Sequence, residues 1–267
     1  MELIEGAKIA SYAAGKFLLR HLVQFKEVDL KKNEFDFVTK FDKESEEIFF
    51  TLLGAYFPDI PFLSEETGKT WETEVERFWV IDPLDGTANY VRGIPLFVTS
   101  LALVEHGRPV IGVIYDPSRD EIFWAEKGKG AFLNDTPIKV SSHSHIKGAT
   151  LSTTFSYTHD LRRKNSLYFQ YFYGFAQSVR NIGSSALSLA YTAAGRFDAY
   201  WTFSVSLWDI AAGAIVLEEA GGHYSTLSIE EEDFSLLANY PTIEFLGQIS
   251  ICSRFYLKSY YKTPEIY

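Results

Sequence analysis

The sequence predicts an α+β fold in which helices and strands alternate within the layers of one domain. Three observations support this fold class: apolar residues at helical spacing near the N-terminus, short β-rich runs in the first half, and interleaved helical and strand patterns in the second half. The chain contains no internal repeat, low-complexity tract or long linker. We therefore expect residues 1–267 to form a single domain of two packed halves, roughly residues 1–140 and 141–267.

Two amphipathic helices are expected at the start. In the first, the apolar face consists of Leu3, Ala7, Ala14, Leu18 and Leu22. The second follows Thr39, because the pattern Thr39-x-x-Asp42 resembles a capping box. Its apolar stripe consists of Ile48, Phe49, Leu52, Leu53 and Tyr56. Pro58 and Pro61 end this helix, since proline cannot continue one. Between the two helices, the polar residues 31–33 suit an exposed loop.

Five short apolar runs follow and predict a meandering, largely antiparallel sheet. They cover residues 61–64, 77–82, 97–106, 109–116 and 121–128. The turn signals Gly107-Arg108-Pro109 and Asp116-Pro117 separate neighbouring runs.

The second half alternates between helices and strands. Helices are expected near 160–174, from Ser184 to Ala194 and from Leu207 to Ala220, with strands near 176–181 and at 197–201. Gly221-Gly222 closes the last helix.

Charge, hydropathy and cysteine content exclude several classes of protein. A formal net charge of -10 leaves no global positive field, which argues against nucleic acid or an anionic membrane as the main partner. The apolar stretches are far shorter than the ~20 residues of a membrane span, so we expect no membrane crossing. Cys252 is the only cysteine and the N-terminal stretch lacks a signal-peptide pattern, so we expect a cytoplasmic protein without a disulfide.

Acidic residues gather where an apolar strand ends at Asp82 and Asp85. Pro83 fixes one backbone angle between them, and Gly86 permits a tight turn after them. The two carboxylates can therefore point to one side, with the Leu84 carbonyl as a third oxygen ligand, a set that suits Mg²⁺. A short helix after Gly86 would direct free N–H groups towards an anion such as phosphate. An ordinary turn explains the spacing equally well, because Asp, Pro and Gly are common turn residues.

Further acids favour the metal interpretation. Glu65 and Glu66 also follow a short apolar strand, and Asp36 and Asp42 flank a helix start. Each of these acids alone is weak evidence for a metal site, because an acid such as Asp42 is more often a helix cap and paired glutamates are more often solvated.

Asp209 is harder to explain as a surface residue. The helix that follows it is apolar on every face over residues 210–217, so it is expected to be buried. A buried acid at its start needs either a capping role or a cation, and we favour the cation.

These acids lie in an ordered set of segments that resembles the inositol monophosphatase family. The main segments are DFVTKFD at 36–42, SEE at 64–66, WVIDPLDGTANY at 79–90 and SLWDIAAGAIVLEEAGG at 206–222. Supporting segments are GVIYDP at 112–117, KGKGAFLND at 127–135 and RNIGSSAL at 180–187. The resemblance therefore covers nearly the whole chain.

The resemblance implies a layered αβαβα sandwich and an enzyme, usually a homodimer, that acts with Mg²⁺. The expected reaction is the hydrolysis of inositol 1-phosphate, or of a related polyol or sugar phosphate, by a metal-activated water. By matching position, the metal ligands would be Glu65, Asp82, the Leu84 carbonyl, Asp85 and Asp209.

The resemblance also implies roles around the reacting groups. Glu65 and Thr87 would orient the attacking water, and Asp42 would support Thr87 and a further, weaker ion. Backbone groups around Gly86 and Thr87 would hold the phosphate. The residues expected to face the substrate are Glu65, Leu84, Asp85, Gly86, Thr87, Gly183, Ser184, Thr202 and Asp209.

One position departs from the family pattern. Thr202 stands where many members carry an acid that binds inositol hydroxyls, and a short hydroxyl cannot replace that carboxylate. Fructose 1,6-bisphosphate, a nucleotide 3′,5′-bisphosphate and histidinol phosphate therefore stay open as substrates. A catalytically silent cation-binding regulatory protein is the alternative from another class. The presence of the whole expected set argues against it: Glu65, Asp82, Asp85, Thr87 and Asp209.

Overall fold

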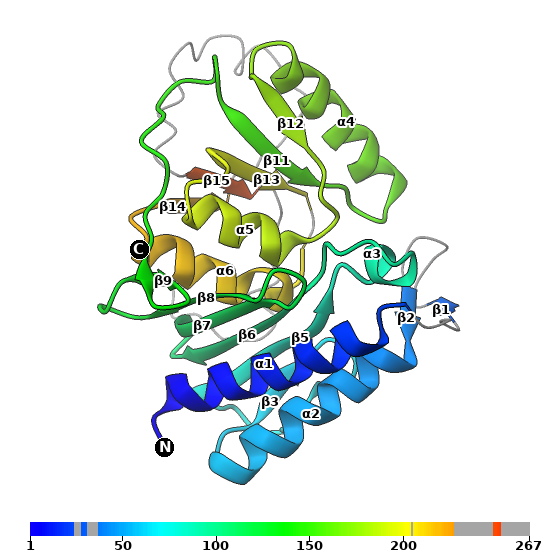
Figure 1. The fold of residues 1–267 in the computed structure, drawn as a ribbon, viewed down its shortest axis with the longest axis vertical. Helices are drawn as coiled ribbons and strands as arrows, with labels where there is room; N and C mark the ends of the chain where they lie inside the picture. The colour runs from blue at the N-terminus through cyan, green and yellow to red at the C-terminus, as the bar shows by residue number, and fades with distance from the viewer. Residues whose placement is uncertain (24–27, 31–36, 204, 227–247, 252–267) are drawn as a thin grey trace.

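The helices and strands of the computed structural model lie in five layers, which follow one another from bottom to top in Figure 1. The structure describes residues 1–23, 28–30, 37–203, 205–226 and 248–251. Helices α1 (Leu3–His21) and α2 (Lys40–Tyr56) form the first layer, and an eight-stranded sheet covers them. Helices α5 (Ser185–Ala193) and α6 (Leu207–Glu219) come next, followed by a five-stranded sheet and α4 (His159–Tyr173). The αβαβα layering implied by the family resemblance is thus confirmed.

The eight-stranded sheet belongs entirely to the first half of the chain. Its strand order is β10-β9-β8-β7-β6-β5-β3-β4, and every neighbouring pair is antiparallel except β3 and β5. The strands are β3 (Phe62–Ser64), β4 (Gly68–Lys69), β5 (Arg77–Asp85), β6 (Val98–Glu105), β7 (Arg108–Asp116), β8 (Glu121–Glu126), β9 (Ala131–Leu133) and β10 (Thr136–Pro137). The prediction of a largely antiparallel meander is confirmed, and the short strands β4, β9 and β10 are additions to it.

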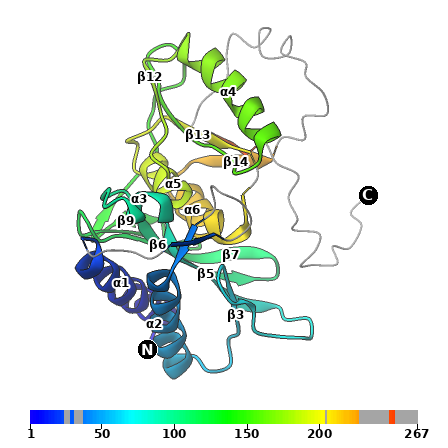
Figure 2. The same ribbon diagram turned by 90° about the vertical axis from the view of Figure 1, so that its right-hand side faces the viewer.

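The five-stranded sheet belongs to the second half and is parallel throughout. Figure 2 shows its strands β12, β13 and β14 from the side, near α4. Its order is β12 (Ser178–Arg180), β11 (Thr150–Thr154), β13 (Ala199–Thr202), β15 (Gln248–Ile251) and β14 (His223–Thr226). The expected helices and strands of this half are confirmed to within two residues at each boundary, whereas β11, β14 and β15 were not expected.

A two-stranded antiparallel ribbon, β1 (Val28–Leu30) and β2 (Phe37–Thr39), precedes α2. The loop expected at residues 31–33 lies outside the described residues. The capping box at the start of α2 is confirmed, because the Thr39 amide donates to Asp42 and the Thr39 hydroxyl accepts from the first helical turn.

Apolar packing between the layers fixes their positions. Phe49 and Leu53 of α2 are fully buried beneath the sheet, against a core that includes Trp79 of β5. Tyr56 departs from the predicted stripe: 43% of it is exposed, and the next residue, Phe57, packs against the core instead. None of the described helices is both long and apolar enough to span a bilayer.

Helix α6 is buried on all sides between the two sheets, as its apolar sequence predicts. Gly112 of β7 makes this close packing possible, since a Cβ there would lie 2.5 Å from the carbonyl oxygen of Ala212. The burial of α6 places its first turn, and with it Asp209, against the end of β5.

Candidate metal centre and active site

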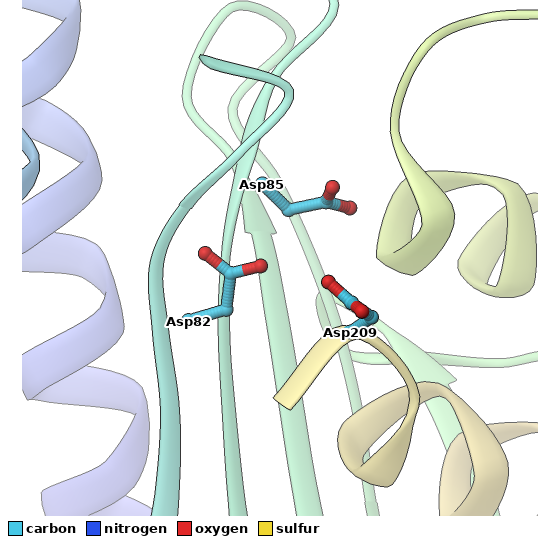
Figure 3. A group of neighbouring side chains, drawn as sticks. All are labelled: Asp82, Asp85 and Asp209. Atoms are coloured by element: carbon cyan, nitrogen blue, oxygen red, sulfur yellow. The ribbon is translucent and has the colours of Figure 1, made fainter. Parts of the chain in front are cut away.

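Three aspartates converge where β5 and α6 meet. Asp82 and Asp85 lie at the end of β5, where the pairing with β6 shifts register, and Asp209 lies in the first turn of α6. One carboxylate oxygen from each lies within 4.8 Å of the others. Figure 3 shows the three side chains pointing towards a common space.

The electrostatics of this cluster favour a bound cation. Burial raises the pKa of Asp82 well above its ordinary value, and the negative charges of Glu65, Asp85 and Asp209 raise it further. Burial also raises the pKa of Asp85 to about 6, against the opposing effect of hydrogen bonds from Ser184 and backbone amides. A divalent cation would relieve this repulsion, and an all-oxygen donor set suits a hard ion such as Mg²⁺.

Asp85 is held by the N-terminus of α5. The Ser184 hydroxyl and the Ala186 amide each donate to Oδ2 of Asp85 at 2.6 Å. The Ser184 hydroxyl also caps α5 by accepting a 3.2 Å hydrogen bond from the Leu187 amide. In this structure the predicted substrate contact Ser184 thus supports an expected metal ligand.

Thr87 links the expected ligands to α2. Its hydroxyl lies 3.2 Å from Oδ1 of Asp42 and 3.0 Å from the Leu84 carbonyl oxygen. The other oxygen of Asp42 accepts 2.7 Å hydrogen bonds from the amide and hydroxyl of Thr39. The Leu84 amide donates to Asp82 at 3.0 Å, which fixes the turn between the two aspartates. Asp42 therefore caps α2 with one oxygen and faces Thr87 with the other.

Glu65 and Asp209 occupy different places relative to the cluster. Asp209 belongs to it and also accepts a 2.6 Å hydrogen bond from the Ser206 amide, so capping and cluster roles coexist. Glu65 is not one of the three clustered acids, although its charge acts on Asp82. Its amide donates to the carbonyl of Ile81, the residue before Asp82, at 3.1 Å.

The remaining predicted residues lie around this centre. Gly86 has a φ of 98° and precedes α3 (Thr87–Val91), the short helix expected there. Gly183 has a φ of 72° and lies against Asn89, whose amide donates 2.7 and 2.8 Å hydrogen bonds to the carbonyls of Leu96 and Ile182. Asn89, which the sequence analysis did not single out, therefore ties α3 to the segment before α5.

Thr202 is buried at the end of β13. Its hydroxyl donates to the Thr154 carbonyl at 3.2 Å and lies 3.0 Å from the Thr154 hydroxyl. The same Thr154 hydroxyl also lies 2.5 Å from the Tyr200 hydroxyl and 3.2 Å from that of Ser185. A neutral group of hydroxyls thus occupies the position at which the family resemblance leads us to expect an acid.

The model of the inositol monophosphatase family matches residues 1–245. The chain belongs to this family. Its members are phosphatases, and this protein is a phosphatase enzyme. The resemblance carried by the acidic segments of the sequence is therefore confirmed.

Two curated members of the family illustrate the similarity. "Nus factor SuhB" of Xylella fastidiosa is 39% identical over 221 residues, which cover 80% of this chain and 78% of that protein. "Inositol-1-monophosphatase" of Mesorhizobium japonicum is 38% identical over 221 residues, covering 82% of this chain and 83% of that protein.

Solved structures of the family share the fold. Inositol monophosphatase from Anabaena (Nostoc) sp. PCC 7120 is 40% identical, with a TM-score of 0.73 and coverage of 82% of both chains. A structure described as an IMPase/NADP phosphatase complexed with Mg²⁺ and phosphate is 26% identical, with a TM-score of 0.71, covering 82% of this chain and 81% of that one.

Proposed function

We propose that this phosphatase is Mg²⁺-dependent and hydrolyses inositol 1-phosphate or a related polyol or sugar phosphate. The observation that carries the proposal is the convergence of the buried Asp82 and Asp85 with the half-buried Asp209, whose carboxylates repel one another unless a cation lies between them. A relative that carries Mg²⁺ and phosphate in its crystal structure supports the choice of ion.

The donor set of this chain fits Mg²⁺. Asp82, Asp85 and Asp209 would hold it, with the Glu65 carboxylate and the Leu84 carbonyl as further ligands. When bound, Mg²⁺ polarises phosphoryl oxygens, lowers the pKa of water and stabilises a leaving alkoxide.

Thr87 and Glu65 are proposed to orient the attacking water. If the Thr87 hydroxyl donates to Asp42, 3.2 Å away, its oxygen is left to accept a proton of the water. The Glu65 carboxylate supplies a second acceptor, so the water oxygen is directed at phosphorus. The new oxygen–phosphorus bond forms as the ester bond breaks, and a proton of the water finally resides on the released alcohol. Asp42 keeps the Thr87 hydroxyl turned in the productive direction.

The substrate is proposed to lie between the two halves of the chain. Backbone groups of Gly86 and Thr87 would hold the phosphate, and Gly183, Ser184 and Thr202 would face the polyol. Because Thr202 offers a neutral hydroxyl that is bonded within the protein, we expect weaker selection for inositol than an acid at this position gives.

The test is phosphate release from inositol 1-phosphate, fructose 1,6-bisphosphate, adenosine 3′,5′-bisphosphate and histidinol phosphate, with Mg²⁺ and with excess chelator. We expect inositol 1-phosphate or another monophosphate to be turned over with Mg²⁺ and none with chelator. Turnover that survives the chelator would disprove the metal mechanism. Preference for a bisphosphate would leave the metal mechanism standing and overturn the substrate assignment.

We further propose that residues 1–267 act as one domain and that the protein is a cytoplasmic homodimer. The packing of α6 against strands of the first half and against β14 of the second supports one domain. Light scattering of the purified protein measures the oligomeric state directly, and a monomeric mass would overturn the homodimer.

A further inference from the structure

A buried glutamate on α2 contacts the turn that carries Glu65. Glu46 is 3% exposed, and its two carboxylate oxygens both accept hydrogen bonds from Thr67. The Thr67 amide donates to Oε1 at 3.1 Å and the Thr67 hydroxyl donates to Oε2 at 2.5 Å. Placing a carboxylate in the interior is costly unless its oxygens are bonded, and here both bonds go to one residue of the turn.

The turn is short and is held at both ends. Strands β3 and β4 pair Ser64 with Gly68, so residues 65–67 form the three-residue connection between them. At its first residue, the Glu65 amide donates to the Ile81 carbonyl. At its last residue, Thr67 is held by Glu46. A turn fixed at both ends leaves the backbone of Glu65 little freedom.

The face of helix α2 that carries Glu46 also contacts the segment from Asp82 to Thr87. Asp42, Ser45 and Glu46 are spaced three and four residues apart, so they share one side of the helix, and all three are buried. Asp42 faces Thr87, and the Ser45 hydroxyl donates to the Pro83 carbonyl at 2.9 Å. One helix face therefore touches both the segment from Asp82 to Thr87 and the turn after β3.

We propose that Glu46 is a positioning residue, which fixes the turn at residues 65–67 so that Glu65 faces Asp82 and the proposed metal. Glu46 would act only through Thr67 and would touch neither metal nor substrate. The inference rests on the proposed function, because it concerns the place of Glu65 relative to that ion. The Glu65 amide donates to the carbonyl of Ile81, the residue before Asp82, so the turn places Glu65 beside the part of β5 that carries Asp82.

The test compares Glu46→Ala with Leu53→Val in the full chain. Leu53 is buried on the same helix, seven residues and two turns away, so its variant loses core packing without touching Thr67. Titration with Mn²⁺, a paramagnetic substitute for Mg²⁺, gives the dissociation constant without any turnover. We expect Glu46→Ala to raise this constant about tenfold, the usual effect of removing a partner behind the ligands, and Leu53→Val to leave it unchanged.

Amide hydrogen exchange without metal tests the contact itself. We expect the peptide containing Thr67 to exchange faster in Glu46→Ala than in Leu53→Val. Thr67→Val removes only the hydroxyl bond of an exposed residue and should shift both measurements the same way by a smaller factor, so it carries the test if Glu46→Ala does not fold. Glu46→Gln, which keeps an acceptor for the Thr67 amide, should recover part of the metal affinity.

The outcomes separate the two proposals. If the wild-type protein binds Mn²⁺ and Glu46→Ala or Thr67→Val binds it equally well, the positioning role is wrong and the proposed function stands. If the wild-type protein binds no Mn²⁺ and Mg²⁺ does not activate it, the proposed function is wrong and the positioning role falls with it.

Discussion

The hydroxyl of Ser184 donates a 2.6 Å hydrogen bond to Oδ2 of Asp85, and this bond joins the first turn of α5 to the end of β5. The two residues are 99 positions apart in the chain. The Ala186 amide bonds to the same oxygen, so the position of Asp85 depends on the N-terminus of a helix from the other half of the protein. The candidate metal centre is therefore built by both halves together.

Removing the Ser184 hydroxyl should weaken metal binding as well as the fold. Ser184→Ala loses both the bond to Asp85 and the cap of α5, and loss of a cap costs about 1 kcal/mol. We expect the Mg²⁺ concentration for half-maximal phosphate release to rise several-fold. A magnesium titration of activity, with thermal melting in parallel, measures both effects.

Two variants separate these effects. Ser184→Thr keeps a hydroxyl and a cap, so it should restore Mg²⁺ affinity. Thr192→Val removes a buried hydroxyl that bonds to the Ser188 carbonyl of the same helix, away from Asp85, so it should change stability alone. An unchanged magnesium titration in Ser184→Ala would contradict the supporting role of this hydroxyl.

Neutralising Asp82 should have opposite effects on activity and on metal-free stability. Asp82→Asn removes a proposed ligand, so we expect Mg²⁺-dependent phosphate release to fall below detection. It also removes one of the three like charges in the cluster, so the melting temperature without divalent ions should rise by about 2–4 °C for each kcal/mol of repulsion relieved. Asp135→Asn makes the same chemical change at an exposed site and should alter neither. A lower melting temperature in Asp82→Asn would mean that repulsion among the three clustered carboxylates does not destabilise the metal-free protein.

The raised pKa of Asp85 predicts how stability depends on pH in the absence of metal. The folded-state pKa of about 6 lies above the ordinary value of 3.8, so the folded protein holds this proton more tightly than the unfolded chain does. The stabilisation of the fold by the protonated Asp85 carboxyl is complete below about pH 4 and is lost as the pH rises through about 6. We expect the melting temperature in chelator to fall between pH 5 and pH 7 more steeply in the wild type than in Asp85→Asn. Equal pH slopes of the melting temperature in the wild type and in Asp85→Asn would contradict the raised pKa of Asp85.

Local patterns allowed several parts of the site to be predicted from sequence. The capping-box spacing of Thr39 and Asp42 located the start of α2, and the apolar run after Asp209 indicated a buried helix. For such acids the sequence offered capping and cation binding as alternatives. The structure combines them, because a carboxylate has two oxygens: Asp42 caps with Oδ2 and faces Thr87 with Oδ1.

Contacts between distant segments were beyond sequence reasoning. Glu46 bonds to a residue 21 positions away, and Asn89 bonds to a carbonyl 93 positions away, and no local spacing encodes either pairing. Periodicity offered one signal for Glu46, since it lies four residues after Asp42 on a face that continues into Phe49 and Leu53. An acid on an otherwise buried helix face indicates a polar partner, although it does not identify which one.

The turn at Gly86 should be intolerant of any side chain, and Gly93 provides a matched comparison. Both glycines have positive φ, 98° and 69°, so an alanine at either costs about 1–2 kcal/mol in backbone strain. At Gly93 nothing lies within 4 Å of the added Cβ, whereas at Gly86 it would lie 2.8 Å from the Leu96 carbonyl oxygen and 3.2 Å from the Cα of Phe97. Gly86→Ala should therefore unfold at a lower urea concentration than Gly93→Ala and lose at least tenfold in phosphate release, because the clash displaces Thr87. Equal urea midpoints and full activity in both variants would show that the backbone at this turn can move aside.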